Sequence, residues 1–317
     1  PGELVGTAPE ADYILIRTED GASEYLIEEY NWVSGAEYAD SIGADVLNTS
    51  LGYSLFDDPS QNHTYADMDG NTTPITIGAD IAASRGMAVV NSAGNSGTSS
   101  WFYITAPADG DSVFTIGAVN AQGIPASFSS NGPTYDERIK PNVSAQGEGT
   151  YIAQPDGSFT YGNGTSFSSP IIAGMTACLW QANPGLTNID IYNAIEQSSS
   201  LAPEFDYKLG YGIPDFMAAN NYLSVEEIDP NDFFSEASAY PNPFNDMLSL
   251  AFSAERSFSF TLSLMDMTGR TVVSEEHSAD QGSNLLILNN LDNVPSGIYF
   301  LRIESGNAVF NSKVIKQ

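Results

Sequence analysis

The sequence predicts an α/β domain with a doubly wound, mainly parallel sheet, followed by a small all-β antiparallel sandwich. In the first part of the chain, short apolar runs alternate with helical patterns, which indicates repeated strand and helix units. From residue 248 onward the apolar pattern has a period of two, which is typical of antiparallel strands with one buried face. Residues 226–238 between the two patterns are acidic and lack a period, which indicates a linker.

The α/β part is expected to begin with a buried strand at Tyr13–Arg17 and a helix at Glu24–Ile42. Apolar residues recur in that helix at helical spacing, namely Leu26, Ile27, Tyr30, Val33 and Ala36. The later elements expected are a strand at 45–50, a helix at 75–85, a strand at 87–91 and helices at 166–182, 187–197 and 214–223. Ligands of such sheets bind beyond the carboxyl ends of the strands, so residues 50–52 and 91–95 are predicted to border the site.

The sandwich is predicted from alternating apolar residues. Its strands are expected around 248–252, 258–264, 285–288, 298–303 and 309–310, and Thr268–Gly269 is expected to form a hairpin turn. The domain boundaries that follow are 1–224 for the α/β domain, 225–238 for the linker and 239–317 for the sandwich.

The 317-residue chain carries a formal net charge of −30, most of it before the sandwich. Residues 239–317 contain five basic and eight acidic residues, so nearly all of the acidic excess belongs to residues 1–238. Such a surface repels nucleic acid and anionic lipid, so neither is expected as a partner. No apolar run reaches the roughly 18 residues that a membrane helix needs, so no membrane span is expected.

Two further features of the sequence are its single cysteine and a segment that resembles part of a calcium-binding loop. Cys178 lies in an apolar helical pattern and is expected to behave as a small buried hydrophobe. Asp67–Asn71 resembles the opening of an EF-hand loop, but Gly78 stands where that loop requires Glu, so we expect an ordinary turn. No cofactor is expected to be required for function. A structural calcium ion is an alternative that the sequence leaves open.

The segment Gly164–Pro170, followed by an apolar run to Trp180, predicts a serine at the start of a buried helix. Gly164 permits a sharp turn, and Pro170 is expected to be tolerated because first-turn amides have no intrahelical partner. Ser166 would then lie at the positive end of a helix dipole, where a hydroxyl can act as a nucleophile if a base removes its proton.

This segment resembles the serine motif of the subtilisin-like peptidases, and Asn91–Gly97 resembles a second motif of that family. The resemblance implies that Ser166 is the catalytic nucleophile. It also implies that Asn95 donates its side-chain amide to the oxyanion that forms during catalysis, a contact worth roughly 3 to 4 kcal/mol. Further similar segments follow in the family's order, namely Gly6–Pro9, Ser127–Pro133, Ile139–Val143 and Gly210–Gly212.

The segment Val46–Tyr53 is similar to the family's substrate-binding strand, whose backbone pairs with an extended peptide. The resemblance implies a pocket between two walls of mostly small residues, formed by Ser50, Leu51 and Gly52 on one side and Ser92, Ala93 and Gly94 on the other. Tyr53 is expected either to border a more distant subsite or to pack in the core.

The family's mechanism also requires an Asp and a His before the serine, the His acting as general base. The chain has two histidines, and neither His63 nor His277 stands where the base is expected. The chain starts at Pro1 without an initiator Met or a signal peptide, just downstream of the family's His segment. We therefore expect an N-terminally truncated subtilase that is inactive alone. The alternative is a non-catalytic surface protein that uses the groove for peptide binding or adhesion.

Residues 239–317 resemble the C-terminal sorting domains of the Bacteroidetes type IX secretion system. The resemblance rests on Ala239–Phe244, Met267–Arg270, Pro295–Tyr299 and Lys313–Gln317. It implies export across the outer membrane, to the cell surface or the medium, with the secretion machinery as partner. The alternatives are a fibronectin-like spacer and a glycan-binding sandwich. The substrates implied for the first domain are proteins or peptides.

Overall fold

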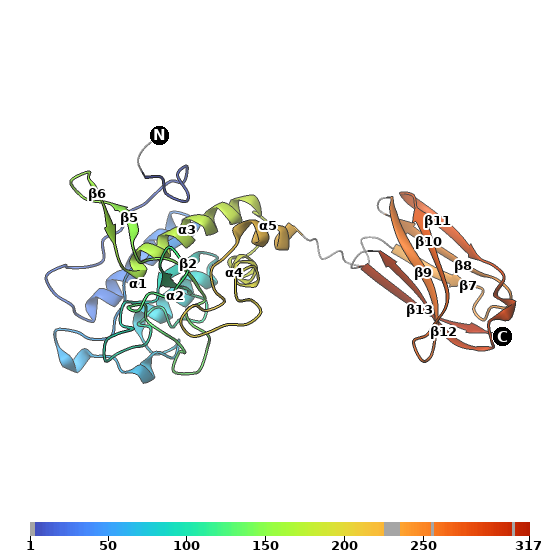
Figure 1. Ribbon diagram of the computed structural model, residues 1–317, viewed down its shortest axis with the longest axis horizontal. Coiled ribbons are helices and arrows are strands. Elements are labelled where there is room, and N and C mark those ends of the chain that lie inside the picture. Colours follow the sequence, from blue (N-terminus) through green and yellow to red (C-terminus); the bar gives the residue numbers. More distant parts are fainter. Residues whose placement is uncertain (1–3, 225–234, 255–256, 306–307) are drawn as a thin grey trace. The chain divides into compact units, whose positions relative to one another are not determined.

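The computed structural model describes residues 4–224, 235–254, 257–305 and 308–317, and the chain divides into two units after Ser224 (Figure 1). The division agrees with the predicted end of the first domain. The predicted linker is partly wrong, because Ser235–Tyr240 form strand β7. The remainder of that linker, residues 225–234, lies outside the described residues.

The first unit contains a parallel sheet with strand order β1-β2-β3-β4, as predicted for the fold class. The strands are β1 (Val46–Thr49), β2 (Ala88–Ser92), β3 (Phe114–Val119) and β4 (Val143–Gln146). The helices are α1 (Ile27–Ser41), α2 (Pro74–Ser84), α3 (Thr165–Ala182), α4 (Asn188–Gln197) and α5 (Phe216–Ser224). Short 3-10 turns lie at Pro59–Gln61 and Tyr65–Asp67.

Helices cover both faces of this sheet, so β2 is buried along its whole length. Val89 points to one face and packs in a cluster with Trp32 of α1 and Ile75 of α2. Its neighbour Val90 points to the other face and packs with Ile172 of α3. Successive side chains of a strand face opposite sides, so a strand between two helical layers is apolar throughout.

The expected strand at Tyr13–Arg17 is wrong. These residues have no regular secondary structure, and Leu15 is 94% exposed. A strand needs a neighbour that satisfies its backbone hydrogen bonds, and no described strand pairs with this segment. The apolar face expected for α1 is also partly wrong, because Ile27 and Tyr30 are exposed while Glu28 and Glu29 are buried.

Cys178 is exposed, which corrects the expectation of a buried thiol. It lies on the side of α3 away from the sheet, where its Sγ lies 3.4 Å from the Thr7 carbonyl oxygen. The residues that α3 packs inward include Ile172 and Leu179. The segment Asp67–Asn71 does form a turn, in which the Asn71 amide donates to Asp69 Oδ1 at 2.9 Å.

Three elements of the first unit were not predicted, namely β3, β4 and a hairpin of β5 (Thr150–Ala153) and β6 (Phe159–Gly162). The buried run in β3 carries the apolar signal of a central strand, and it could have been found from that signal. The exposed hairpin carries a weaker signal, since both strands are mostly accessible.

The second unit confirms the antiparallel β prediction. One sheet has the order β10-β9-β12-β13 and the other β11-β8-β7, and their inward side chains form one core. The strands are β8 (Leu248–Ala254), β9 (Phe258–Asp266), β10 (Thr271–Ala279), β11 (Gly282–Leu288), β12 (Gly297–Ser305) and β13 (Ala308–Lys316), with a 3-10 turn at Leu291–Asn293. The predicted turn joins β9 to β10, and Gly269 adopts a φ of +83° there.

Candidate active site

Ser166 is the second residue of α3, at the end of the helix that meets the carboxyl ends of the sheet strands. The chain enters α3 from the β5–β6 hairpin, and the Gly164 amide donates to the Gly147 carbonyl at 2.8 Å. Gly147 must be small, because a Cβ there would come 2.8 Å from the Gly164 oxygen. This contact places the start of α3 beside the end of β4.

Ser50 follows β1 and lies against Ser166, since its Oγ donates to the Ser166 carbonyl at 3.3 Å. In an α-helix that carbonyl bonds to the amide four residues later, which here belongs to Pro170 and lacks a hydrogen. Pro170 is thus beyond the first turn, which corrects the expected reason for its tolerance. The free Ser166 carbonyl is instead paired with the substrate-strand residue Ser50.

Asn95 follows β2, and hydrogen bonds to its side-chain oxygen hold the side chain in place. Asn95 Oδ1 accepts hydrogen bonds from the Thr165 amide at 2.9 Å and from Thr165 Oγ1 at 3.1 Å. Its Nδ2 then faces the start of α3, where a Cβ built on Gly164 would lie 3.8 Å from it. Neither Asn95 Nδ2 nor the Ser166 amide donates to another group among the described residues, so both are available to an oxyanion.

The residues after β1 differ in their exposure and in their backbone hydrogen bonds. Ser50 and Gly52 are exposed, and their backbone groups make no main-chain hydrogen bond within the described part of the chain. Tyr53 differs, since it is 1% exposed and its backbone pairs with Ala106 in both directions. Of the two roles expected for Tyr53, its burial fits core packing. Leu51 is partly buried, and its carbonyl accepts from Asn91 Nδ2 at 3.4 Å.

The opposite predicted wall is largely enclosed. Ser92 and Ala93 are buried at the end of β2, while Gly94 is partly exposed with φ at +103°. Thr105, which the sequence did not single out, lies between the two walls. A Cβ on Gly52 would come 2.2 Å from Thr105 Oγ1, and one on Gly94 would come 3.1 Å from it. The glycines therefore make room for a buried threonine hydroxyl that has no partner among the described residues.

Each histidine is paired with a carboxylate of its own unit. His63 Nε2 pairs with the buried carboxylate of Glu29, and its ring lies edge-on to Phe56. His277 belongs to strand β10 of the second unit and pairs with Glu275. His63 therefore makes no hydrogen bond to Ser166.

The segment Ile139–Val143 supports the sheet. Lys140 is 2% exposed, and its Nζ donates to the Val113 carbonyl and, at 3.2 Å, to Asn142 Oδ1. Burial lowers the pKa of Lys140 to about 8. Because Val113 precedes β3 and Asn142 precedes β4, this lysine ties the starts of two neighbouring strands together.

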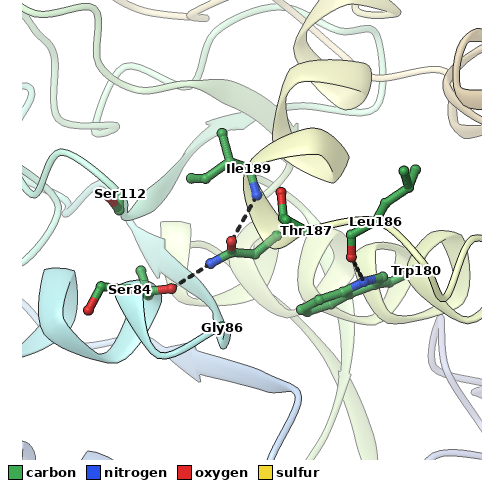
Figure 2. Close-up of a pocket in the computed structure, with 9 residues that line it drawn as sticks. Ser84, Gly86, Ser112, Trp180, Leu186, Thr187 and Ile189 are labelled. Atoms are coloured by element: carbon green, nitrogen blue, oxygen red, sulfur yellow. Dashed lines mark hydrogen bonds between the residues drawn. The ribbon is translucent and has the colours of Figure 1, made fainter. Parts of the chain in front are cut away.

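The hollow drawn in Figure 2 lies away from Ser166. It is lined by the end of α2 and by the connection from α3 to α4, including Ser84, Gly86, Trp180 and Thr187. Trp180 follows Ser166 by 14 residues on α3, a separation of about 21 Å at the rise of an α-helix. This hollow is therefore not part of the candidate active site.

The first unit is a doubly wound α/β domain in which Ser166 stands at a helix terminus close to the Asn95 side chain. Residues 1–212 match the sequence model of the Subtilase family. The chain belongs to the subtilase family of serine peptidases. Residues 238–317 match the model of a secretion system C-terminal sorting domain, so the chain is exported to the cell surface or the medium.

Curated relatives support the family. The chain is 32% identical over 219 residues to subtilisin E of Bacillus subtilis, covering 68% of this chain and 51% of that protein. It is 32% identical over 209 residues to subtilisin DY of Bacillus licheniformis, covering 65% of this chain and 68% of that protein. The chain spans about half the length of subtilisin E and three similar subtilisins.

Solved structures support the fold. The MycP3 protease from the type VII (ESX-3) secretion system superposes with a TM-score of 0.55 at 22% identity, over 69% of each chain. None of the helices in the described part of the chain combines the length and apolar composition that a membrane span requires.

Proposed function

We propose that this chain is the C-terminal part of a secreted serine endopeptidase whose nucleophile is Ser166. The observation that carries the proposal is the pairing of Asn95 Oδ1 with the Thr165 amide. It fixes the orientation of a side-chain amide whose Nδ2 is directed toward the start of α3. Asn95 Nδ2 and the Ser166 amide are the two donors that we propose for the oxyanion hole.

In this mechanism Ser166 Oγ attacks the peptide carbonyl, and its proton passes to a histidine base. The negative charge that develops on the carbonyl oxygen is stabilised by Asn95 Nδ2 and the Ser166 amide. The protonated base then gives its proton to the departing amine, which leaves an acyl ester on Ser166. Water, activated by the same base, hydrolyses this ester and regenerates the serine.

We propose that the base and its partner Asp belong to residues upstream of Pro1. The position of His63 supports this, since it pairs with the buried Glu29 and not with Ser166. The unpaired segment at Tyr13–Arg17 supports it as well, because Tyr13, Ile14 and Leu15 are 69%, 54% and 94% exposed. An exposed apolar segment of this kind is suited to pairing with a further strand. Residues 1–317 alone are expected to hydrolyse peptides slightly at most.

The proposed substrates are proteins or peptides bound in extended form along Ser50–Gly52. The unpaired and exposed backbone there supports pairing with a substrate strand. The threonine hydroxyl of Thr105 beside Gly52 and Gly94 narrows the space between the two walls. This favours small or polar substrate side chains next to the cleaved bond.

The proposed partner of residues 238–317 is the type IX secretion machinery. Deletion of these residues in the native host is expected to leave the protein in the periplasm, because the sorting domain is then absent. A deleted protein that still reaches the cell surface or medium would contradict this role.

The peptidase proposal is tested with the complete gene product and a fluorescently labelled, unfolded protein substrate. Hydrolysis is expected in the wild type and is expected to be lost in Ser166→Ala. The matched control is Ser158→Ala, since Ser158 is an exposed serine beside the turn of the β5–β6 hairpin. Hydrolysis by Ser166→Ala at the wild-type rate would overturn the proposal.

A further inference from the structure

Three glutamates converge beside the loop that follows the substrate strand. They are Glu19 and Glu24, from the segment before α1, and Glu28 in the first turn of α1. One carboxylate oxygen from each lies within 4.8 Å of the corresponding oxygens of the other two. Asp57 borders the group, since its Oδ2 accepts from the Glu24 amide at 3.1 Å.

Glu28 carries an unpartnered charged oxygen into this group. Its side chain is part of a residue that is 3% exposed. Glu28 Oε1 accepts from the Asp20 amide at 2.9 Å, whereas the buried Oε2 has no hydrogen-bond partner in the described part of the chain. A buried carboxylate oxygen left without a partner costs free energy, so such groups are normally paired or coordinate a metal.

Protein cations do not neutralise the group. None of the ion pairs within the described residues involves Glu19, Glu24 or Glu28. The nearby guanidinium of Arg17 donates through Nε to the Glu19 main-chain oxygen at 2.9 Å.

We infer that Glu19, Glu24 and Glu28 bind a divalent cation of the calcium class. Calcium takes six to eight oxygen ligands in a flexible geometry, which carboxylates supply together with main-chain oxygens and water. Magnesium demands a stricter octahedron and retains its water, so three carboxylates on two segments suit it less. The inference concerns the chain's own residues and does not depend on the proposed peptidase activity.

The cation would connect two segments of the chain directly and a third, the loop at Tyr53, through the Tyr53–Glu19 hydrogen bond. Glu19 and Glu24 belong to the segment before α1, and Glu28 belongs to the helix itself. Tyr53 donates its hydroxyl to Glu19 Oε1, and the Tyr53 backbone pairs with Ala106 across the pocket. A cation bound here is therefore expected to stabilise the loop that holds Ser50–Gly52 in place.

The test uses calcium-stripped full chain, with binding measured by isothermal titration of CaCl₂ and stability measured as Tm. The wild type is expected to bind calcium and to gain Tm with it. Glu28→Gln is expected to weaken binding at least about tenfold, since it removes the unpartnered oxygen's charge. The matched control is Glu37→Gln, an exposed glutamate on the same helix, which is expected to respond as the wild type does.

The sign of the stability change gives a second test. In calcium-free buffer Glu28→Gln is expected to be at least as stable as the wild type, because it relieves repulsion. In excess CaCl₂ the order is expected to reverse. If Glu28→Gln fails to fold, Glu24→Gln serves instead, because Glu24 is only half-buried. An equal calcium response in the wild type and the site variants, no calcium binding at all, or an equal response to MgCl₂ would each overturn the inference.

Discussion

Ser50 Oγ donates a hydrogen bond of 3.3 Å to the backbone carbonyl of Ser166, joining the end of β1 to the start of α3. The contact exists because Pro170 has no amide hydrogen to offer that carbonyl. Two segments that are more than a hundred residues apart in the sequence are thereby held together beside the proposed nucleophile. The proposed nucleophile and the segment predicted to bind substrate are therefore joined by one hydrogen bond.

Replacing Pro170 with Ala is expected to stabilise α3 and weaken this contact. An alanine amide can donate to the Ser166 carbonyl and complete the helical hydrogen bond, a gain of up to about 3 kcal/mol. The carbonyl is then shared with Ser50, so the serine is held less firmly for catalysis. Calorimetry of the complete gene product should show a higher Tm, and substrate turnover should be slower. An unchanged or lower Tm would argue against this account of Pro170.

Replacing Asn95 with Asp separates the two functions of its side chain. The aspartate retains an acceptor for the Thr165 amide, but it loses the Nδ2 donor proposed for the oxyanion. We expect kcat to fall about 10²- to 10³-fold, the usual effect of removing one such donor, with little change in Tm. Asn120→Asp is the matched control, because Asn120 Oδ1 also accepts two hydrogen bonds, there from the backbone amides of Gln122 and Ile124, outside the site. A kcat within threefold of the wild type would exclude the role of Asn95.

The elements that the sequence predicted correctly are those with strong local patterns. The apolar runs of β1 and β2 and the long apolar stretch of α3 each carry their own signal. Tyr13–Arg17 has an equally apolar sequence but does not form a strand. Strand formation depends on a neighbour elsewhere in the chain, which a local pattern does not report.

The candidate site was predictable in part for the same reason. Ser166 and Asn95 stand in motifs whose spacing and family resemblance are visible in the sequence, and their catalytic roles stay predictions. The contacts that orient them depend on the tertiary structure. Thr165 beside Asn95, Ser50 beside Ser166 and Thr105 beside Gly52 are all long-range pairs, and no local signal indicates them.

The stability of the calcium-free chain is expected to depend on the titration of Glu24. Its pKa is raised from 4.5 to about 7 in the folded chain, so the folded state holds its proton more tightly than the unfolded state. The resulting stabilisation is complete below pH 4.5 and is lost as the pH rises through 7. The causes of this rise are burial and then the negative charges of Glu28, Glu19 and Asp57.

Tm measured from pH 5 to pH 8 in calcium-free buffer should therefore fall more steeply in the wild type than in Glu24→Gln. Saturating calcium should reduce the difference, because a bound cation favours the ionised carboxylate. Parallel profiles of the two proteins without calcium would contradict the raised pKa of Glu24.

His63 is expected to act as a structural residue. Its side chain is 11% exposed and that of its partner Glu29 is fully buried, so His63→Ala leaves a buried carboxylate unpaired. Leaving a buried hydrogen-bonding group without its partner costs about 1 to 3 kcal/mol, and urea unfolding should show a loss of this size. Adding Glu29→Gln should restore part of it, since an amide costs less to bury than a carboxyl group that can ionise. Protein that remains folded should retain its substrate turnover, whereas complete loss of turnover at full stability would indicate a catalytic histidine.

The central claim is that Ser166 is an activated nucleophile, and its most direct test is labelling with a serine-directed fluorophosphonate. The complete gene product is treated with the probe, and the adduct is located by mass spectrometry. We predict an adduct on Ser166 that disappears in Ser166→Ala and persists in Ser158→Ala. No labelling of the folded complete product, or labelling that persists in Ser166→Ala, would contradict the claim. The first of these results would favour a peptide-binding surface protein.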